Sequence, residues 1–216
     1  MKIIEEPTGV LDFRSTMYPS VGNKVTDQEF HAIPYSTVYG FVVSGHTVLP
    51  NSKIAIVNEY FSISVKESEK FSVNGTTVFI TRLGYQGQTL LGGPIENSGR
   101  LCYIDGCSDS LLVYPARMGD PSLNFLYFPP NIDQTFHIHP SIRIGVIANG
   151  KGTCSLASGI VELNAGDMFC LEERETHRFS TQDESMTVIA YHPDGDWGPT
   201  DHNHSMLNRT YITKKS

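Results

Sequence analysis

The sequence has few of the features that mark membrane and secreted proteins. No apolar run among its 216 residues approaches the roughly 20 that span a bilayer. The segment 1–13 carries acids where a signal peptide would have an apolar core. The four cysteines form no CxxC pair, and Cys154 and Cys170 lie inside apolar runs, which favours buried thiols over disulfides or ligands. We therefore expect a cytoplasmic protein with no membrane partner.

Positive charge is also scarce. The chain has 16 basic and 23 acidic residues, which gives a formal net charge of −7. We find no basic stripe interleaved with aromatic residues, the pattern that marks a surface for nucleic acid. The sequence therefore predicts no nucleic-acid partner.

Helical periodicity is equally scarce, and short runs of β-branched and aromatic residues take its place. Gly, Asn, Asp and Pro interrupt these runs at close intervals, which is typical of a β-sandwich or a β-barrel. The runs include residues 36–43, 53–65, 76–85, 123–130, 142–148 and 186–193. The sequence therefore predicts an all-β protein, and "ANGKG" (148–152) predicts a hairpin turn.

The stretch "PARMGDPS" (115–122), near the middle of the chain, has the composition of a loop and is a candidate domain boundary. We place a domain boundary there, between an N-terminal β unit (1–115) and a C-terminal unit (116–216) that carries the histidine motif. The N-terminal unit has His31 and His46 at no ligand spacing, so we expect ordinary surface or hydrogen-bonded histidines.

The stretch "QTFHIHPSIRIG" (134–145) contains two histidines that are two residues apart. Alternation along a strand puts His137 and His139 on one face, so that their nitrogens can meet at one divalent metal ion. A third ligand must come from elsewhere in the chain. His177 is the candidate, because it closes a strand that follows a Gly-Asp turn in "NAGDMFCLEERETHRF".

Together these stretches resemble the cupin family over residues 123–192. In the first cupin motif, H-x-H is followed three or four residues on by Glu, and then by six residues and Gly. The second motif begins with Gly-Asp and continues through a Pro-containing turn to a histidine. The matching positions here are His137, His139, Arg143 in place of Glu, Gly150, Gly166, Asp167, Glu172 in place of Pro, and His177.

The resemblance implies a double-stranded β-helix, the cupin jelly-roll barrel, with a divalent ion held in its mouth by His137, His139 and His177. It also implies a bicupin, in which the N-terminal half is a degenerate copy of the fold without ligands, and a homodimer.

Arg143 departs from the cupin pattern, because a guanidinium can neither ligate a metal nor lose its proton. Three consequences compete. The site has three histidine ligands, as in cupin dioxygenases, and Arg143 binds an acid group of the substrate. Alternatively, Glu175 replaces the missing acid, with Glu173 a poorer candidate. In the third case no metal binds, and the arginine and imidazoles form a pocket for an anion.

Several further residues are candidates for the substrate pocket. Tyr127 and Gln134 flank the first motif and are expected to orient substrate, with a core tyrosine and a surface glutamine as the structural alternative. The tail holds His192, His202 and His204, which we expect in a solvated loop. If that tail folds over the barrel mouth, Trp197 also lines the pocket.

The leading hypothesis is a metal-dependent cupin enzyme, an Fe(II) dioxygenase acting on a small anionic substrate bound by Arg143. Mn, Ni, Co and Zn remain possible, because imidazole discriminates weakly among these ions. In a second enzymatic hypothesis the protein is a Lewis-acid isomerase, lyase or hydrolase. Two hypotheses involve no catalysis: a cupin that binds a sugar or an organic acid, and a β protein with a relic site.

Overall fold

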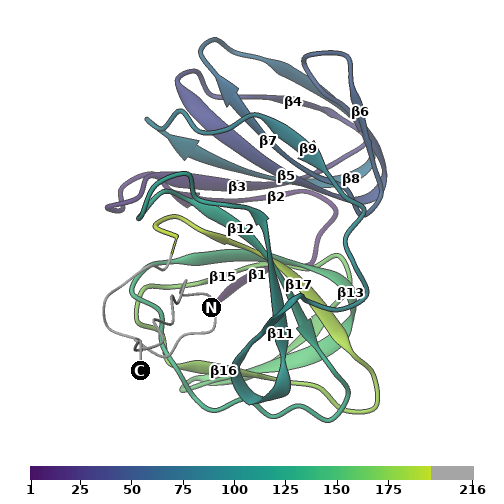
Figure 1. The fold of residues 1–216 in the computed structure, drawn as a ribbon, viewed down its shortest axis with the longest axis vertical. Helices are drawn as coiled ribbons and strands as arrows, with labels where there is room; N and C mark the ends of the chain where they lie inside the picture. Colours follow the sequence, from purple (N-terminus) through teal and green to yellow (C-terminus); the bar gives the residue numbers. More distant parts are fainter. Residues whose placement is uncertain (196–216) are drawn as a thin grey trace, which may run out of the picture.

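The computed structural model describes residues 1–195, and its regular structure is almost entirely β (Figure 1). The exception within that range is one short 3-10 turn, η1 (Ile104–Gly106). No helix in the described part of the chain is long and apolar enough to cross a membrane. The prediction of an all-β protein is confirmed.

The strands form two sheets, which define two units (Figure 1). The N-terminal unit consists of β2 (Gly9–Phe13), β3 (Ser20–Thr26), β4 (Glu29–His31), β5 (Ser36–Val48), β6 (Ile54–Ile56), β7 (Tyr60–Val65), β8 (Lys70–Leu83) and β9 (Leu90–Gly92). The C-terminal unit consists of β1 (Lys2–Ile4), β10 (Leu101–Cys102), β11 (Ser108–Val113), β12 (Ser122–Phe128), β13 (Arg143–Leu156), β14 (Gly159–Asn164), β15 (Met168–Leu171), β16 (His177–Ser180) and β17 (Met186–His192).

The division between the units is not the predicted one near residue 115. Strands β10 and β11 precede that position, yet β11 pairs antiparallel with β12 in the C-terminal sheet. At the other end of the chain, β1 pairs with β15, so that Lys2 lies opposite Cys170. The prediction is wrong because the turn-rich residues 115–122 join β11 to β12 as a hairpin within one unit, instead of linking two units.

The two sheets repeat one strand order. The N-terminal order is β2-β3-β8-β5-β7-β9, and the C-terminal sheet contains the equivalent order β11-β12-β17-β13-β15-β1, with β10 added beyond β11. In each unit the long central strand, β5 or β13, also pairs with a short neighbour, β6 or β14. This common order supports the degenerate N-terminal cupin implied by the resemblance, which stays a prediction.

The central strands also share a sequence pattern. "STVYGFVVSG" begins β5, and "SIRIGVIANG" begins one residue before Ile142 and runs into β13, so that Gly40 corresponds to Gly145. Both strands shift register at the same place, just before the second glycine of the pattern. There Gly45 has φ +70° and Gly150 has φ +72°, a conformation that glycine adopts without steric cost.

The glycine bend replaces the hairpin predicted at 148–152. Strand β13 continues through this stretch, and its first part pairs with β15 and β17. Its last part, residues 151–156, pairs with β14 and β16. One bent strand therefore belongs to both layers of the barrel, as a double-stranded β-helix requires. The Asn-Gly pair at 149–150 therefore lies at a bend within one strand, and the chain does not reverse there.

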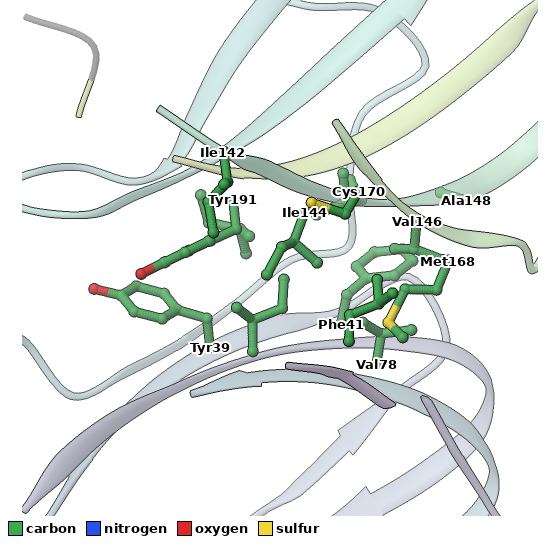
Figure 2. Packing of buried hydrophobic residues seen from close by; sticks show 14 of the residues in the cluster. Tyr39, Phe41, Val78, Ile142, Ile144, Val146, Ala148, Met168, Cys170 and Tyr191 are labelled. Carbon is green, nitrogen blue, oxygen red and sulfur yellow. The ribbon is translucent and has the colours of Figure 1, made fainter. Parts of the chain in front are cut away.

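Three hydrophobic clusters stabilise this architecture. One fills the N-terminal unit around Phe61, Phe71 and Phe79, and a second fills the C-terminal unit around Phe128 and Phe169. The third lies between the two sheets. Figure 2 shows this third cluster, where Tyr39, Phe41 and Val78 of one unit face Ile142, Ile144, Val146, Met168 and Tyr191 of the other.

The packing between the sheets fixes the interior of the C-terminal unit. The Tyr39 and Tyr191 rings lie 5.2 Å apart, and the Tyr191 hydroxyl is 3.2 Å from Ser20 Oγ. Because side chains alternate along a strand, the residues between those of this cluster point the other way. On β13 these are Arg143, Gly145 and Ile147, which therefore face the interior of the C-terminal barrel.

Candidate metal centre

Two segments far apart in the sequence bring the predicted histidines together. His137 and His177 form an isolated antiparallel bridge, in which each backbone N–H donates to the other's carbonyl at 3.0 Å. His139 follows two residues later, and its carbonyl accepts a hydrogen bond from the Arg174 N–H at 2.9 Å. Backbone pairing thus places the H-x-H segment beside the first residue of β16.

The three imidazoles converge. Their ring centroids lie 4.4 Å apart for His137 and His177, and 5.1 Å apart for each pair that includes His139. One ligating nitrogen from each ring lies within 4.8 Å of the other two. Nitrogens that lie about 2 Å from a shared ion are separated by a little over 3 Å, so small side-chain adjustments close this geometry.

Hydrogen bonds fix the tautomer of two of the rings. The Nδ1 atoms of His137 and His177 lie 2.8 Å from the carbonyl oxygens of Thr135 and Glu175. A carbonyl only accepts, so each Nδ1 carries the proton and donates it. The Nε2 lone pair of each ring is then available to a metal, an arrangement typical of metal-binding histidines.

His177 is the histidine whose surroundings most clearly indicate a bound metal ion. Its side chain is fully buried, and its Nε2 has no hydrogen-bond partner among the described residues. Burial, with a smaller contribution from His137, His139 and Arg143, lowers the pKa of His177 from 6.5 to about 3. The imidazole is therefore neutral at physiological pH. A buried, neutral nitrogen without a partner fits a first-row divalent cation.

Arg143 lies beside this cluster and is 3% exposed. It begins β13, and its Nη1 donates to the Ser141 carbonyl, the Ser141 hydroxyl and the Ile142 carbonyl at 3.0, 2.6 and 2.9 Å. Asp194 Oδ1 lies 3.9 Å from Nη1. The guanidinium is thus held in place by the loop before β13, at the edge of the histidine cluster.

Glu175 does not occupy the position predicted for it. One carboxylate oxygen accepts a hydrogen bond from the Glu172 N–H at 2.9 Å, and the other pairs with the amino group of Met1. Within the described residues, the cluster with metal-ligand geometry contains the three histidines and no carboxylate. The prediction assumed a regular strand before His177, whereas β16 begins only at that residue.

Two further residues predicted to line the pocket lie in different places. Tyr127 packs against the cluster between the sheets, on the face of β12 that points away from the barrel interior, which is the core alternative given for it. Gln134 is 1% exposed, which corrects the surface alternative. Its Oε1 accepts the Phe179 N–H at 3.3 Å and its Nε2 donates to Cys107 Sγ at 3.5 Å. Its role toward substrate stays a prediction. Trp197, His202 and His204 lie outside the described residues.

The barrel interior holds more polar residues, which the sequence analysis missed. His192 ends β17 instead of lying in a solvated loop; it is 7% exposed, and its ring centroid lies 6.4 Å from that of His139. Ser122 pairs with it in register, and Asn124 and Asp109 follow on β12 and β11. The sequence does contain a signal for this polar face. In "SLNF" (122–125) and "AYH" (190–192), Ser122, Asn124 and His192 alternate with large apolar residues, so the polar side chains point away from the apolar ones.

The family of the AraC-like ligand binding domain matches residues 126–199. This segment contains the H-x-H pair, Arg143 and His177. No curated protein matches the chain.

Solved structures resemble almost the whole chain. A cupin 2 conserved barrel domain protein from Leptotrichia buccalis has 10% sequence identity and a TM-score of 0.62, over 88% of both chains. A protein described as glyoxylate-induced, from Pseudomonas aeruginosa, has 15% identity and a TM-score of 0.65, over 96% of this chain and 83% of its own. A salicylate 1,2-dioxygenase variant from Pseudoaminobacter salicylatoxidans, in complex with gentisate, has 9% identity and a TM-score of 0.58, over 86% and 74%. At these identities the likeness shows the fold alone.

Proposed function

Since the chain has the fold of the cupin superfamily, we propose that it is a metal-dependent enzyme acting on a small anionic molecule. In this proposal His137, His139 and His177 hold a divalent ion, and Arg143 binds the acid group of the substrate. The convergence of three imidazole nitrogens within 4.8 Å, next to the buried Arg143, is the observation that carries it.

The charges of the site favour an anionic substrate. Three neutral imidazoles do not offset the two charges of the ion, and Arg143 adds a third positive charge nearby. Asp194, at 3.9 Å from Arg143, offsets one of them. Like charges in a buried site repel strongly, so an anion between the ion and the guanidinium lowers the energy of the whole arrangement. A planar carboxylate also matches the geometry of the guanidinium.

Fe(II) is the ion we favour, since it supplies the electrons for a reaction with O2, and all-imidazole sites also accept Mn, Ni, Co and Zn. The protein's own contribution is positional. The carbonyls of Thr135 and Glu175 hold two imidazoles in one tautomer, and Arg143 orients the acid. The structural likeness to a dioxygenase that holds gentisate supports an aromatic or otherwise small organic acid as substrate.

Metal content and oxygen consumption test this proposal together. Elemental analysis of the purified protein is expected to find one of these ions in stoichiometric amount. Oxygen uptake is then followed during addition of salicylate, gentisate, short dicarboxylic acids and thiol acids. Protein without any of these metals, even after reconstitution, would contradict the proposal.

Arg143→Gln tests the role of the guanidinium. We expect binding of an active acid to weaken by at least about tenfold, the loss of a charge-assisted pair, while the metal content stays unchanged. The control is Arg178→Gln, because Arg178 lies on β16 next to His177 but pairs with Asp133 outside the barrel. Equal losses of metal and acid binding in Arg143→Gln would show a structural role instead.

A second candidate function is binding without turnover. It is favoured by the match to a ligand binding domain, which covers the whole of the proposed site. A binding protein shows the same dependence of acid binding on Arg143 but no oxygen uptake and no product. Product analysis by mass spectrometry in the presence of a bound acid therefore separates the two functions.

A further inference from the structure

The short turn before β11 contacts the segment that carries the H-x-H pair. This turn consists of η1 and Cys107. Within it, the Asp105 carboxylate accepts a hydrogen bond from the Thr135 N–H, 30 residues later in the sequence, at 2.6 Å. The Thr135 hydroxyl lies 3.4 Å from the other oxygen of the same carboxylate. Hydrogen bonds to a charged acceptor are short and strong, so the turn holds the backbone at Thr135.

Thr135 is also the residue that orients His137. Its carbonyl accepts the Nδ1–H of His137 at 2.8 Å, which leaves Nε2 of this imidazole available to a metal ion. A ligand whose second nitrogen is bonded in this way is held in one tautomer and one orientation. The Asp105 carboxylate therefore binds the N–H of the same residue whose carbonyl fixes the ring.

His137 needs this support because its segment is not part of a regular strand. The bridges that join the segment to β16 are isolated ones, at Asp133 and at His137. Between them, Thr135 and Phe136 are exposed and belong to no strand. Exposed backbone with few hydrogen bonds is where local opening of a structure is easiest. A carboxylate that binds this backbone restricts the part of the chain that carries the imidazole.

The turn that carries Asp105 is itself anchored. Asp105 has φ 53° and ψ 35°, a left-handed conformation that aspartate tolerates better than most residues. The Cys107 N–H donates to the Ile104 carbonyl at 3.1 Å. The buried Cys107 Sγ accepts a hydrogen bond from Gln134 Nε2 at 3.5 Å. Two side chains of the turn, one charged and one buried, therefore contact the consecutive residues Gln134 and Thr135.

We propose that Asp105 is a positioning residue for the metal centre, which acts through Thr135 on the orientation of His137. This inference rests on the proposed function, in which His137 is a metal ligand. Asp105 lies outside residues 126–199, the segment that matches the family of ligand binding domains. The metal centre thus depends on a turn that precedes this segment in the sequence.

Asp105→Gly removes the carboxylate and keeps the turn, because glycine adopts a positive φ without steric cost. Asp27→Gly is the matched control. Asp27 is also exposed, has φ 51° and accepts the Gly75 N–H at 2.7 Å, but it lies in the N-terminal unit. Each change deletes one exposed carboxylate and one hydrogen bond to a backbone N–H, so we expect similar losses of stability. A difference between them in metal binding therefore reports on the metal centre.

Titration with Zn²⁺ in competition with a chelator measures the metal affinity of each protein. We expect Asp105→Gly to bind Zn²⁺ about tenfold more weakly than the wild type, the lower end of the range for residues that orient metal ligands. Asp27→Gly should equal the wild type. Asp105→Asn should stay within about threefold of the wild type, since its amide oxygen also accepts the Thr135 N–H. Equal losses in Asp105→Gly and Asp105→Asn would show that the charge of Asp105 acts on the ion directly, and would overturn the positioning role.

Nitrogen NMR of the metal-free protein, at a pH at which the imidazoles are neutral, gives a readout that needs neither metal nor turnover. In the wild type we expect His137 in one tautomer, with the proton on Nδ1. In Asp105→Gly its two nitrogen signals should move toward the average of both tautomers, while those of His177 stay unchanged. Hydrogen exchange of the wild type tests the contact itself. The exposed Thr135 amide should exchange at least about tenfold more slowly than an unprotected amide.

The outcomes separate this inference from the proposed function. Wild-type protein that binds no metal ion overturns the proposed function, and the tautomer of His137 then decides the role of Asp105 by itself. Equal metal affinity of the wild type and Asp105→Gly overturns the inference and leaves the proposed function standing. An unchanged His137 tautomer in Asp105→Gly also overturns it. If Asp105→Gly does not fold, exchange of the Thr135 amide at the unprotected rate in the wild type overturns it instead.

Discussion

The two units share one strand order, but their interiors differ in chemistry. Arg143 lies two residues before Gly145, and its counterpart two residues before Gly40 is Val38, which is fully buried. The residue opposite Gly145 on β17 is Ala190, and the residue opposite Gly40 on β8 is a phenylalanine, Phe79. The C-terminal unit therefore has a charge and a small side chain where the N-terminal unit has hydrocarbon.

Aromatic packing fills the N-terminal interior. Phe30 stacks on Phe79 with ring centroids 4.1 Å apart, and Phe71 contacts both Phe61 and Phe79, at 5.8 and 5.3 Å. Gln134 has a comparable place in the C-terminal unit, since Phe30 pairs with Phe71 of β8 and the Gln134 N–H donates to the Phe179 carbonyl of β16. The same strand order thus encloses aromatic packing in one unit and buried polar side chains in the other.

Removal of a histidine ligand is the largest expected effect. His177→Ala deletes a buried nitrogen from the cluster, so metal affinity is expected to fall by at least about a hundredfold. The control is His46→Ala on β5 of the N-terminal unit, which should leave metal binding unchanged. Equilibrium dialysis with elemental analysis measures both. Metal retained equally by the two variants would remove the functional difference between the units.

Phe79→Ala tests whether the N-terminal interior serves stability. The fully buried ring contacts three other phenylalanines, so the cavity should lower the free energy of unfolding by about 3–5 kcal/mol. Phe136→Ala, at a half-exposed position, should cost less than about 1 kcal/mol. Denaturant unfolding measures both, and metal binding by folded Phe79→Ala should equal that of the wild type. A loss of metal from the native variant would show that the units are coupled.

The glycine bends should have equal importance in both units. A Cβ at Gly45 would lie 2.0 Å from the Asn74 carbonyl oxygen, and one at Gly150 would lie 1.9 Å from that of Ser185. The contact with backbone and the positive φ together predict a loss of about 2–4 kcal/mol for either change to alanine. Gly84→Ala, at φ +66° and with no atom within 4 Å of the added Cβ, isolates the cost of the backbone conformation. Unequal costs at the two bends would weaken the structural correspondence.

The smallest effect concerns pH and the acid of the C-terminal interior. The pKa of Asp109 is raised from 3.8 to about 7 in the folded protein, so between these values the folded state binds more protons than the unfolded state. Stability should therefore fall by about 1–2 kcal/mol as pH rises from about 6 to 8, and level off above that. Asp109→Asn should flatten this part of the profile. Urea unfolding of both proteins across this range gives the difference, and parallel profiles would contradict it.

The histidine site was predictable from sequence because its geometry is local on each segment. Alternation places His137 and His139 on one face, and a Gly-Asp turn before a strand indicates His177. The face occupied by Tyr127 and the start of β16 near Glu175 depend on register with distant strands. No local pattern encodes that register, so the sequence could not choose between pocket and core for Tyr127, and it placed the Glu175 carboxylate in the cluster, where the structure does not have it.

The internal repeat was missed for a related reason. Its shared residues are a serine and two glycines, spaced alike in 36–45 and 141–150, and the residues between them all differ, including Val38 against Arg143 and Ser44 against Asn149. The spacing of three residues identifies a repeat only when the bend and the strand pairing are also seen to match. Asp109, Ser122 and His192 became recognisable in the same way, once their strands were adjacent. Homodimer formation and a cytoplasmic location stay predictions.

The pairing of β1 with β15 has a consequence for how the protein can be divided. The first strand of the chain closes the sheet edge of the unit that is completed last. If the C-terminal unit were produced without β1, the backbone N–H and C=O groups on the outer side of β15 would be unpaired. Such an exposed strand edge promotes association with other chains. The first strand of the chain thus joins the two halves, in addition to the core that they share.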